Sequence, residues 1–97
     1  MIIPHKVKIL GHWYTVKYLS DSEHMYSKTG SLHGWTQNIG IQGGSDITSS
    51  QQEEVFFHEV LHALDFHLNL DLSEQQTNCI SAGLYQVLVD NHLLKGE

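Results

Sequence analysis

Residues 58–62 read His58-Glu59-Val60-Leu61-His62, and the expected fold is built outward from this stretch. On a helix the second histidine lies about 40° round from the first and one turn further along, so both imidazoles can bind one metal ion. Glu59 is left outside the coordination. A carboxylate there can accept a proton from a metal-activated water and pass it to a leaving amine. The stretch therefore predicts a metal-dependent hydrolytic site on a helix.

The surrounding hydrophobic pattern places the two histidines at the edge of a core. At 100° per residue, the predicted buried stripe of this helix contains Phe57, Val60, Leu61, Leu64 and Leu68. His58, His62 and Asp65 form a polar sector that adjoins the stripe. With eight histidines among 97 residues, a solvent-facing helix with two uninvolved histidines is the alternative. Such histidines would lie opposite the stripe, so the pattern favours a metal site that a second element completes.

The start of this helix is marked by capping residues. Ser50 can accept a hydrogen bond from the first turn, and Glu53 can reach back to the backbone N–H of Ser50. Residues 50–53 therefore predict a capping box, with Ser50 as the N-cap.

The preceding half of the chain predicts a small sheet. Residues 7–10 and 13–18 are β-branched and aromatic segments joined through Gly11-His12, which indicates a hairpin with Gly11 at positive φ. Lys8 and Lys17 alternate with apolar neighbours, which is typical of a sheet with one wet face. Residues 20–31 predict a loop with a short strand or turn near 24–26, and residues 35–41 predict another strand. We expect about three strands, mostly antiparallel.

A second helix is expected after residues 69–72. Ser73 and Gln76 form another capping box, and the predicted apolar stripe, which runs out to about Leu94, contains Ile80, Leu84, Val87 and Leu88. Gly83 suggests close helix packing, because an interior glycine costs about 1 kcal/mol relative to alanine. Cys79 is interpreted as a small buried hydrophobe. The short connection favours antiparallel helices, which would bring Glu74 close to the two histidines.

Several residues compete to be the third metal ligand. Asp65 lies on the same helical sector as the histidines, and His67 and Asp71 are more distant candidates. Ligands from successive turns of one helix are spread along its axis and converge poorly on a tetrahedral centre. We therefore expect His58, His62 and Glu74 to bind the metal. Asp65 would support a ligand imidazole or tie the two helices together, whereas Glu74 as a simple first-turn acidic residue is the alternative.

Three further residues are candidates for donating a hydrogen bond to a tetrahedral oxyanion: Tyr85, Tyr26 and His33. Their spacing favours this role no more than ordinary packing. The other histidines outside the motif and its helix are interpreted as surface or loop residues.

Composition narrows the classes of function. The formal net charge is −6, the chain has five lysines and no arginine, and the basic face that nucleic acids require is missing. The lone Cys79 cannot form an internal disulfide, and the N-terminal residues lack the apolar core of a signal peptide. No run approaches the roughly 18 apolar residues of a membrane helix. We expect a cytoplasmic monomer that binds neither nucleic acid nor membranes directly.

Residues 58–65 (HEVLHALD), 72–74 (LSE), 83–88 (GLYQVL) and 90–91 (DN) resemble the small HExxH metallopeptidase-like proteins of phages and prophages. More loosely, the chain is similar to minimal gluzincins of the repressor-cleaving and SprT-like groups. The resemblance is specific over residues 50–92 and only architectural before them. It implies a zincin-like fold, a zinc ion, Glu59 as general base and the cytoplasm of a bacterium or a phage-infected host. Asp65 and Leu68 replace the glycine and third histidine of metzincins.

The sequence thus predicts one α+β, zincin-like metallopeptidase domain over residues 1–97, acting on a peptide or protein substrate. We expect the strand around residues 39–41 to pair with an extended substrate. The alternative is a non-catalytic, zinc-stabilised protein-interaction module. The retention of a carboxylate at Glu59 favours catalysis, because a structural zinc site needs no base.

Overall fold

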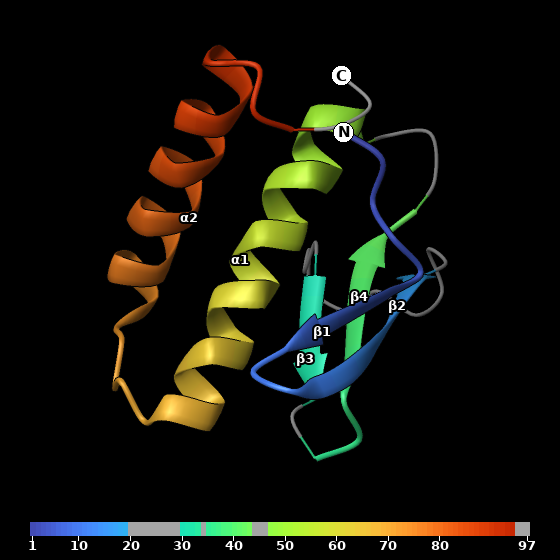
Figure 1. Cartoon of the computed structure of the whole chain (residues 1–97), viewed down its shortest axis with the longest axis vertical. Helices are drawn as coiled ribbons and strands as arrows, with labels where there is room; N and C mark the ends of the chain where they lie inside the picture. The colour runs from blue at the N-terminus through green and yellow to red at the C-terminus, as the bar shows by residue number, and fades with distance from the viewer. Residues whose placement is uncertain (20–29, 34, 44–46, 95–97) are drawn as a thin grey trace.

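The computed structural model describes residues 1–19, 30–33, 35–43 and 47–94, and for residues 30–33 the backbone alone. A four-stranded sheet lies on one side of helix α1, and helix α2 lies on the other side (Figure 1). The strands are β1 (Lys6–Ile9), β2 (His12–Leu19), β3 (Gly30–His33) and β4 (Asn38–Gln42), and the helices are α1 (Ser49–Leu68) and α2 (Glu74–Asp90). The expected α+β class is confirmed.

The sheet has the order β1-β2-β4-β3. β1 and β2 form the expected antiparallel hairpin, in which Leu10 and Gly11 both have positive φ, at 50° and 84°. This is the backbone of a type I′ turn, whose twist matches that of the strands it joins. β2 pairs in parallel with β4, and β3 pairs antiparallel with β4. β3 overlaps the stretch predicted as a loop; the expected strand or turn near residues 24–26 lies outside the described residues.

The position of β4 corrects the expectation about substrate pairing. β4 is hydrogen bonded to β2 on one side and to β3 on the other. Its backbone groups are therefore already paired, and the strand around residues 39–41 cannot accept a peptide. β3 is an end strand of this sheet, and it lies beside α1.

The core lies between the sheet and α1. Tyr14 and Val16 of β2 are buried while Lys17 is exposed, so the predicted one wet face is present. β4 contributes Ile39 and Ile41, both fully buried, from between the polar Asn38 and Gln42. From α1, Phe56 and Ala63 complete this core, with Val60 and Leu64 packed against it.

The buried residues of α1 differ from the predicted stripe. Phe56, Glu59 and Ala63 are buried, whereas Leu68 is 52% exposed. The other members of the predicted stripe are half-buried. The difference arises because α1 is covered on two sides: Phe57, for instance, packs against Tyr85 of α2, with ring centroids 5.8 Å apart.

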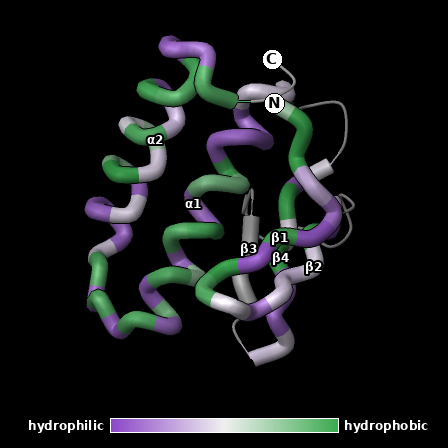
Figure 2. Tube along the Cα trace, in the orientation of Figure 1, coloured by the Kyte–Doolittle hydropathy of each residue, from purple (hydrophilic) through white to green (hydrophobic). Residues whose placement is uncertain are grey.

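The hydrophobic pattern of α2 gave the wrong packing face. Thr77, Ser81 and Tyr85 are buried, whereas Ile80, Leu84 and Val87 are 44%, 45% and 55% exposed. Two small polar residues at a spacing of four let the helices approach closely, and the larger aliphatic residues then point away. Hydrophobic segments alternate with hydrophilic ones along α2 (Figure 2).

Two other predictions on α2 are also wrong. A Cβ atom added at Gly83 would meet nothing within 4 Å, so this glycine does not serve close packing within the chain. Cys79 is exposed rather than buried.

One of the two predicted capping boxes is present. Ser73 and Gln76 form the predicted capping box of α2. The capping box of α1 consists instead of Thr48 and Gln51, so the prediction of Ser50 and Glu53 is wrong. The Thr-Ser-Ser run offers three residues with capping hydroxyls, and the helix begins at the first site that has a glutamine at the third helical position.

We expect Thr48→Ala to lower the free energy of unfolding by about 1 kcal/mol, because it removes the oxygen that accepts the Gln51 N–H. Ser50→Ala is the matched control and should cost less than half as much. Urea unfolding of both variants measures this difference, and equal losses would contradict the assigned cap.

Candidate metal centre

Two helices bring three metal-binding side chains together. His58 and His62 lie one turn apart on α1, and Glu74 is the first residue of α2. The Nε2 atoms of the two histidines are 3.0 Å apart. Glu74 Oε1 lies 3.1 Å from His58 Nε2, and Glu74 Oε2 lies 3.6 Å from His62 Nε2. This group can hold a metal ion.

The connection between the helices sets the position of Glu74. Asn69 ends α1 in the left-handed conformation, its N–H donating to the Asp65 carbonyl, and the Ser73 capping box fixes the start of α2. The Leu72 N–H donates to Asp65 Oδ1 at 3.4 Å. α2 then runs back along α1, antiparallel as expected (Figure 1). Asp65 thus ties the end of α1 to the connection that precedes α2, and it is not part of the three-residue group.

Burial and charge favour the form of His58 that binds metals. Burial and the neighbouring His62 lower the pKa of His58, while Glu74 opposes the shift. A lowered pKa favours the neutral imidazole, which carries the lone pair that a metal needs. The side chains of His58 and His62 are 18% and 29% exposed, and that of Glu74 is 67% exposed. The group is therefore open to solvent from the side of Glu74.

Glu59 follows His58 in α1 but is more deeply buried than either histidine of the site. It is 5% exposed, like the core residue Phe56, three residues earlier on the helix. The group that can hold a metal contains His58, His62 and Glu74. The role of Glu59 as a neighbour of the site rather than a ligand stays a prediction.

The other sequence candidates lie elsewhere. His67 is hydrogen bonded to the Tyr14 hydroxyl at 2.7 Å and stacks on His12, so it is not drawn into the metal group. The Tyr85 hydroxyl donates to Glu53 Oε1 at 2.8 Å. Asp71 is exposed and lines a separate pocket. Tyr26 lies outside the described residues, and His33 is described in its backbone alone, within β3.

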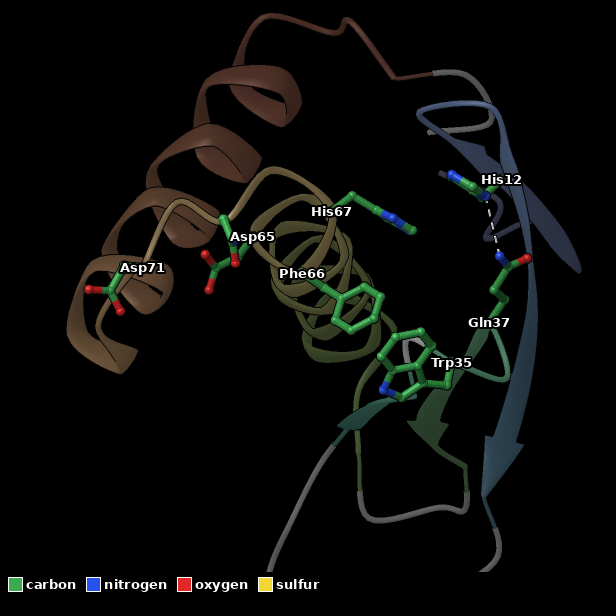
Figure 3. A pocket seen from close by; sticks show the side chains of 8 residues that line it. His12, Trp35, Gln37, Asp65, Phe66, His67 and Asp71 are labelled. Atoms are coloured by element: carbon green, nitrogen blue, oxygen red, sulfur yellow. Dashed lines mark hydrogen bonds between the residues drawn. The ribbon is translucent and has the colours of Figure 1, made fainter.

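The sequence reasoning missed the aromatic neighbours of the site. Trp35 and Phe66 form an edge-to-face pair with ring centroids 5.4 Å apart, beside His67 (Figure 3). Phe66 follows His62 by four residues and is therefore on the same side of α1. That spacing could have drawn attention to Phe66, whereas nothing in the sequence pairs it with Trp35.

No family model matches the chain, and no curated protein or solved structure is significantly similar to it. Within the part of the chain that the structure describes, neither helix is long and apolar enough to cross a bilayer.

We expect Glu74→Gln to weaken the binding of divalent transition metals by at least about tenfold, because an amide is a poorer ligand than a carboxylate. Asp65→Asn is the matched control: it removes a charge from the same region but keeps an oxygen for the Leu72 N–H. Calorimetric titration of the metal-free proteins compares them. A larger loss in Asp65→Asn would assign the third ligand to Asp65.

Proposed function

We propose that the protein is a zinc-dependent peptidase in which His58, His62 and Glu74 bind the metal. The single observation that carries the proposal is the approach of Glu74, from a second helix, to the two histidines of the His-Glu-x-x-His stretch. Two histidines and a glutamate form one of the catalytic zinc donor sets, which leaves a fourth position for water or substrate. The resemblance of residues 50–92 to small HExxH metallopeptidase-like proteins supports the same assignment.

The spacing of the donors fits zinc. Bond lengths of about 2.0–2.1 Å in a tetrahedron separate neighbouring ligand atoms by about 3.3 Å. The two Nε2 atoms are 3.0 Å apart, and each histidine faces a different Glu74 oxygen: Oε1 lies 3.1 Å from His58 and Oε2 lies 3.6 Å from His62. A small rotation of the exposed Glu74 side chain would present one oxygen to both histidines. Without a metal, one of the two imidazoles must carry a proton on Nε2 to make these contacts. A bound metal ion would take the place of that proton.

Glu59 is the proposed general base. Zinc, when bound, lowers the pKa of a coordinated water to about 7 and polarises a carbonyl oxygen. Glu59 would accept the proton as the water attacks the peptide carbonyl and then give it to the departing amine. Glu59 directly follows His58 in α1, and with 5% of its surface exposed it is shielded from bulk water.

The substrate would bind as an extended chain along β3. Among the described strands, β3 ends the sheet, and it lies beside α1, so its outer backbone groups would pair with a peptide that passes the metal site. β3 thus replaces residues 39–41 as the proposed partner strand.

A non-catalytic module is the second candidate, and one observation favours it. The metal group joins the two helices close to their connection, where a bound ion would staple a 97-residue fold with a small core. Such a staple would need no base, so the behaviour of Glu59 separates the two functions.

The test is Glu59→Gln. We expect this variant to bind zinc like the parent protein but to lose at least about 100-fold of its peptide hydrolysis, because an amide cannot accept the proton. Cleavage is read by mass spectrometry on a mixed-sequence peptide library, and zinc by elemental analysis. Glu54→Gln, on the same helix, is the control and should keep both properties. Hydrolysis that survives in Glu59→Gln would refute Glu59 as the base, and loss of zinc would place it in the coordination.

A further inference from the structure

A second hollow lies over the C-terminal end of α1. It has a volume of about 990 Å³ and is formed by the last turns of α1, the connection to α2, the turn after β3 and the start of β2 (Figure 3). Pockets of up to about 1,000 Å³ accommodate small ligands or side chains with adjoining backbone. This pocket can therefore take a substrate side chain.

The pocket is lined by residues of α1 and of the connection to α2 that are close in sequence to the metal group. Phe66 lies one turn beyond His62 on the same side of α1, and Asp71 precedes Glu74 by three residues. Trp35 belongs to the turn that follows β3. A peptide bound at the metal group would therefore lie close to the pocket.

One side of the pocket is aromatic. Trp35 is 91% exposed and Phe66 is 40% exposed, and their rings meet edge to face at 5.4 Å and 86°. The Trp35 ring thus contacts Phe66 and is otherwise largely open to solvent. Cations bind over the exposed faces of aromatic rings, most strongly over tryptophan.

The other side of the pocket is acidic. Asp65 and Asp71 line it, and neither forms a salt bridge with another described residue. The carbonyl end of α1, which carries about half a negative charge, lies beside them. None of the described residues that line the pocket is a lysine, and the chain as a whole has a formal net charge of −6. The remaining wall includes His12 and His67, which stack in parallel at 4.4 Å.

We propose that this pocket binds the basic side chain, arginine or lysine, of the peptide substrate. The carboxylates and the helix end supply charge complementarity, and Trp35 supplies a surface for the cation and for the aliphatic part of the side chain. The pocket makes the enzyme select peptides with a basic residue at one position relative to the cleaved bond. This inference rests on the proposed peptidase function, but its binding step can be measured without cleavage.

The test uses full-length, zinc-loaded protein with Glu59→Gln to prevent hydrolysis and Trp13→Phe to leave Trp35 as the fluorescent reporter. Three probes are titrated: acetyl-Ala-Ala-Arg-Ala-Ala-amide, the same peptide with citrulline at the central position, and the same peptide with leucine. We expect the arginine peptide to change Trp35 fluorescence and to bind about tenfold more tightly than the citrulline peptide, which has the same shape without the charge. Equal affinities, or a preference for leucine, would overturn the proposal.

Charge variants locate the effect. Asp65→Asn and Asp71→Asn should each reduce the preference for arginine over citrulline at least about threefold. Asp90→Asn removes an exposed charge from the far end of α2 and should leave the preference unchanged, so an equal loss there would overturn the assignment to this pocket. Selective arginine binding, together with no peptide hydrolysis by the zinc-loaded protein that retains Glu59, would refute the peptidase function and keep the pocket. Hydrolysis by the protein that retains Glu59, without a preference for a basic residue, would support the peptidase function and refute the role proposed for the pocket.

Discussion

The close antiparallel packing of α2 on α1 is the constraint on which the site depends. Thr77 and Ser81 are small enough to be buried between the helices, and Tyr85 fills the space further along, where its hydroxyl reaches Glu53. With α2 in this position, a connection of five residues brings Glu74 to the two histidines. A bulkier residue at position 77 or 81 would push the helices apart and withdraw the third donor.

The same packing sets the electrostatics of the metal centre. Two imidazoles with ring nitrogens 3.0 Å apart cannot both be protonated without strong repulsion, and burial lowers the pKa of His58 further. Glu74 supplies the negative charge that a cation between them would meet. Folding therefore brings together three side chains that could hold a divalent metal, and metal binding there should stabilise the fold.

Local periodicity predicted part of this structure, and close packing decided the rest. The spacing of His58 and His62 and the capping box at Ser73 depend on a single helix, and the sequence alone was sufficient for them. The position of Glu74 near the histidines could also be predicted, because a short connection restricts how two helices can meet. The packing face of α2 was missed because Ile80, Leu84 and Val87 are more hydrophobic than Thr77 and Ser81, while small volume, not hydrophobicity, determined the contact. The interior position of β4 depends on β3, a four-residue strand in a polar stretch, which no pattern indicated.

X-ray absorption at the zinc edge, on purified protein given one equivalent of zinc, tests the central claim most directly. We predict one bound zinc with four nitrogen or oxygen neighbours at about 2.0–2.2 Å, two of them imidazole, and one position taken by solvent. Two results would contradict the assignment of His58, His62 and Glu74 as an open catalytic metal centre: absence of bound zinc, or a zinc–sulfur distance of about 2.3 Å, which would show that Cys79 is a ligand.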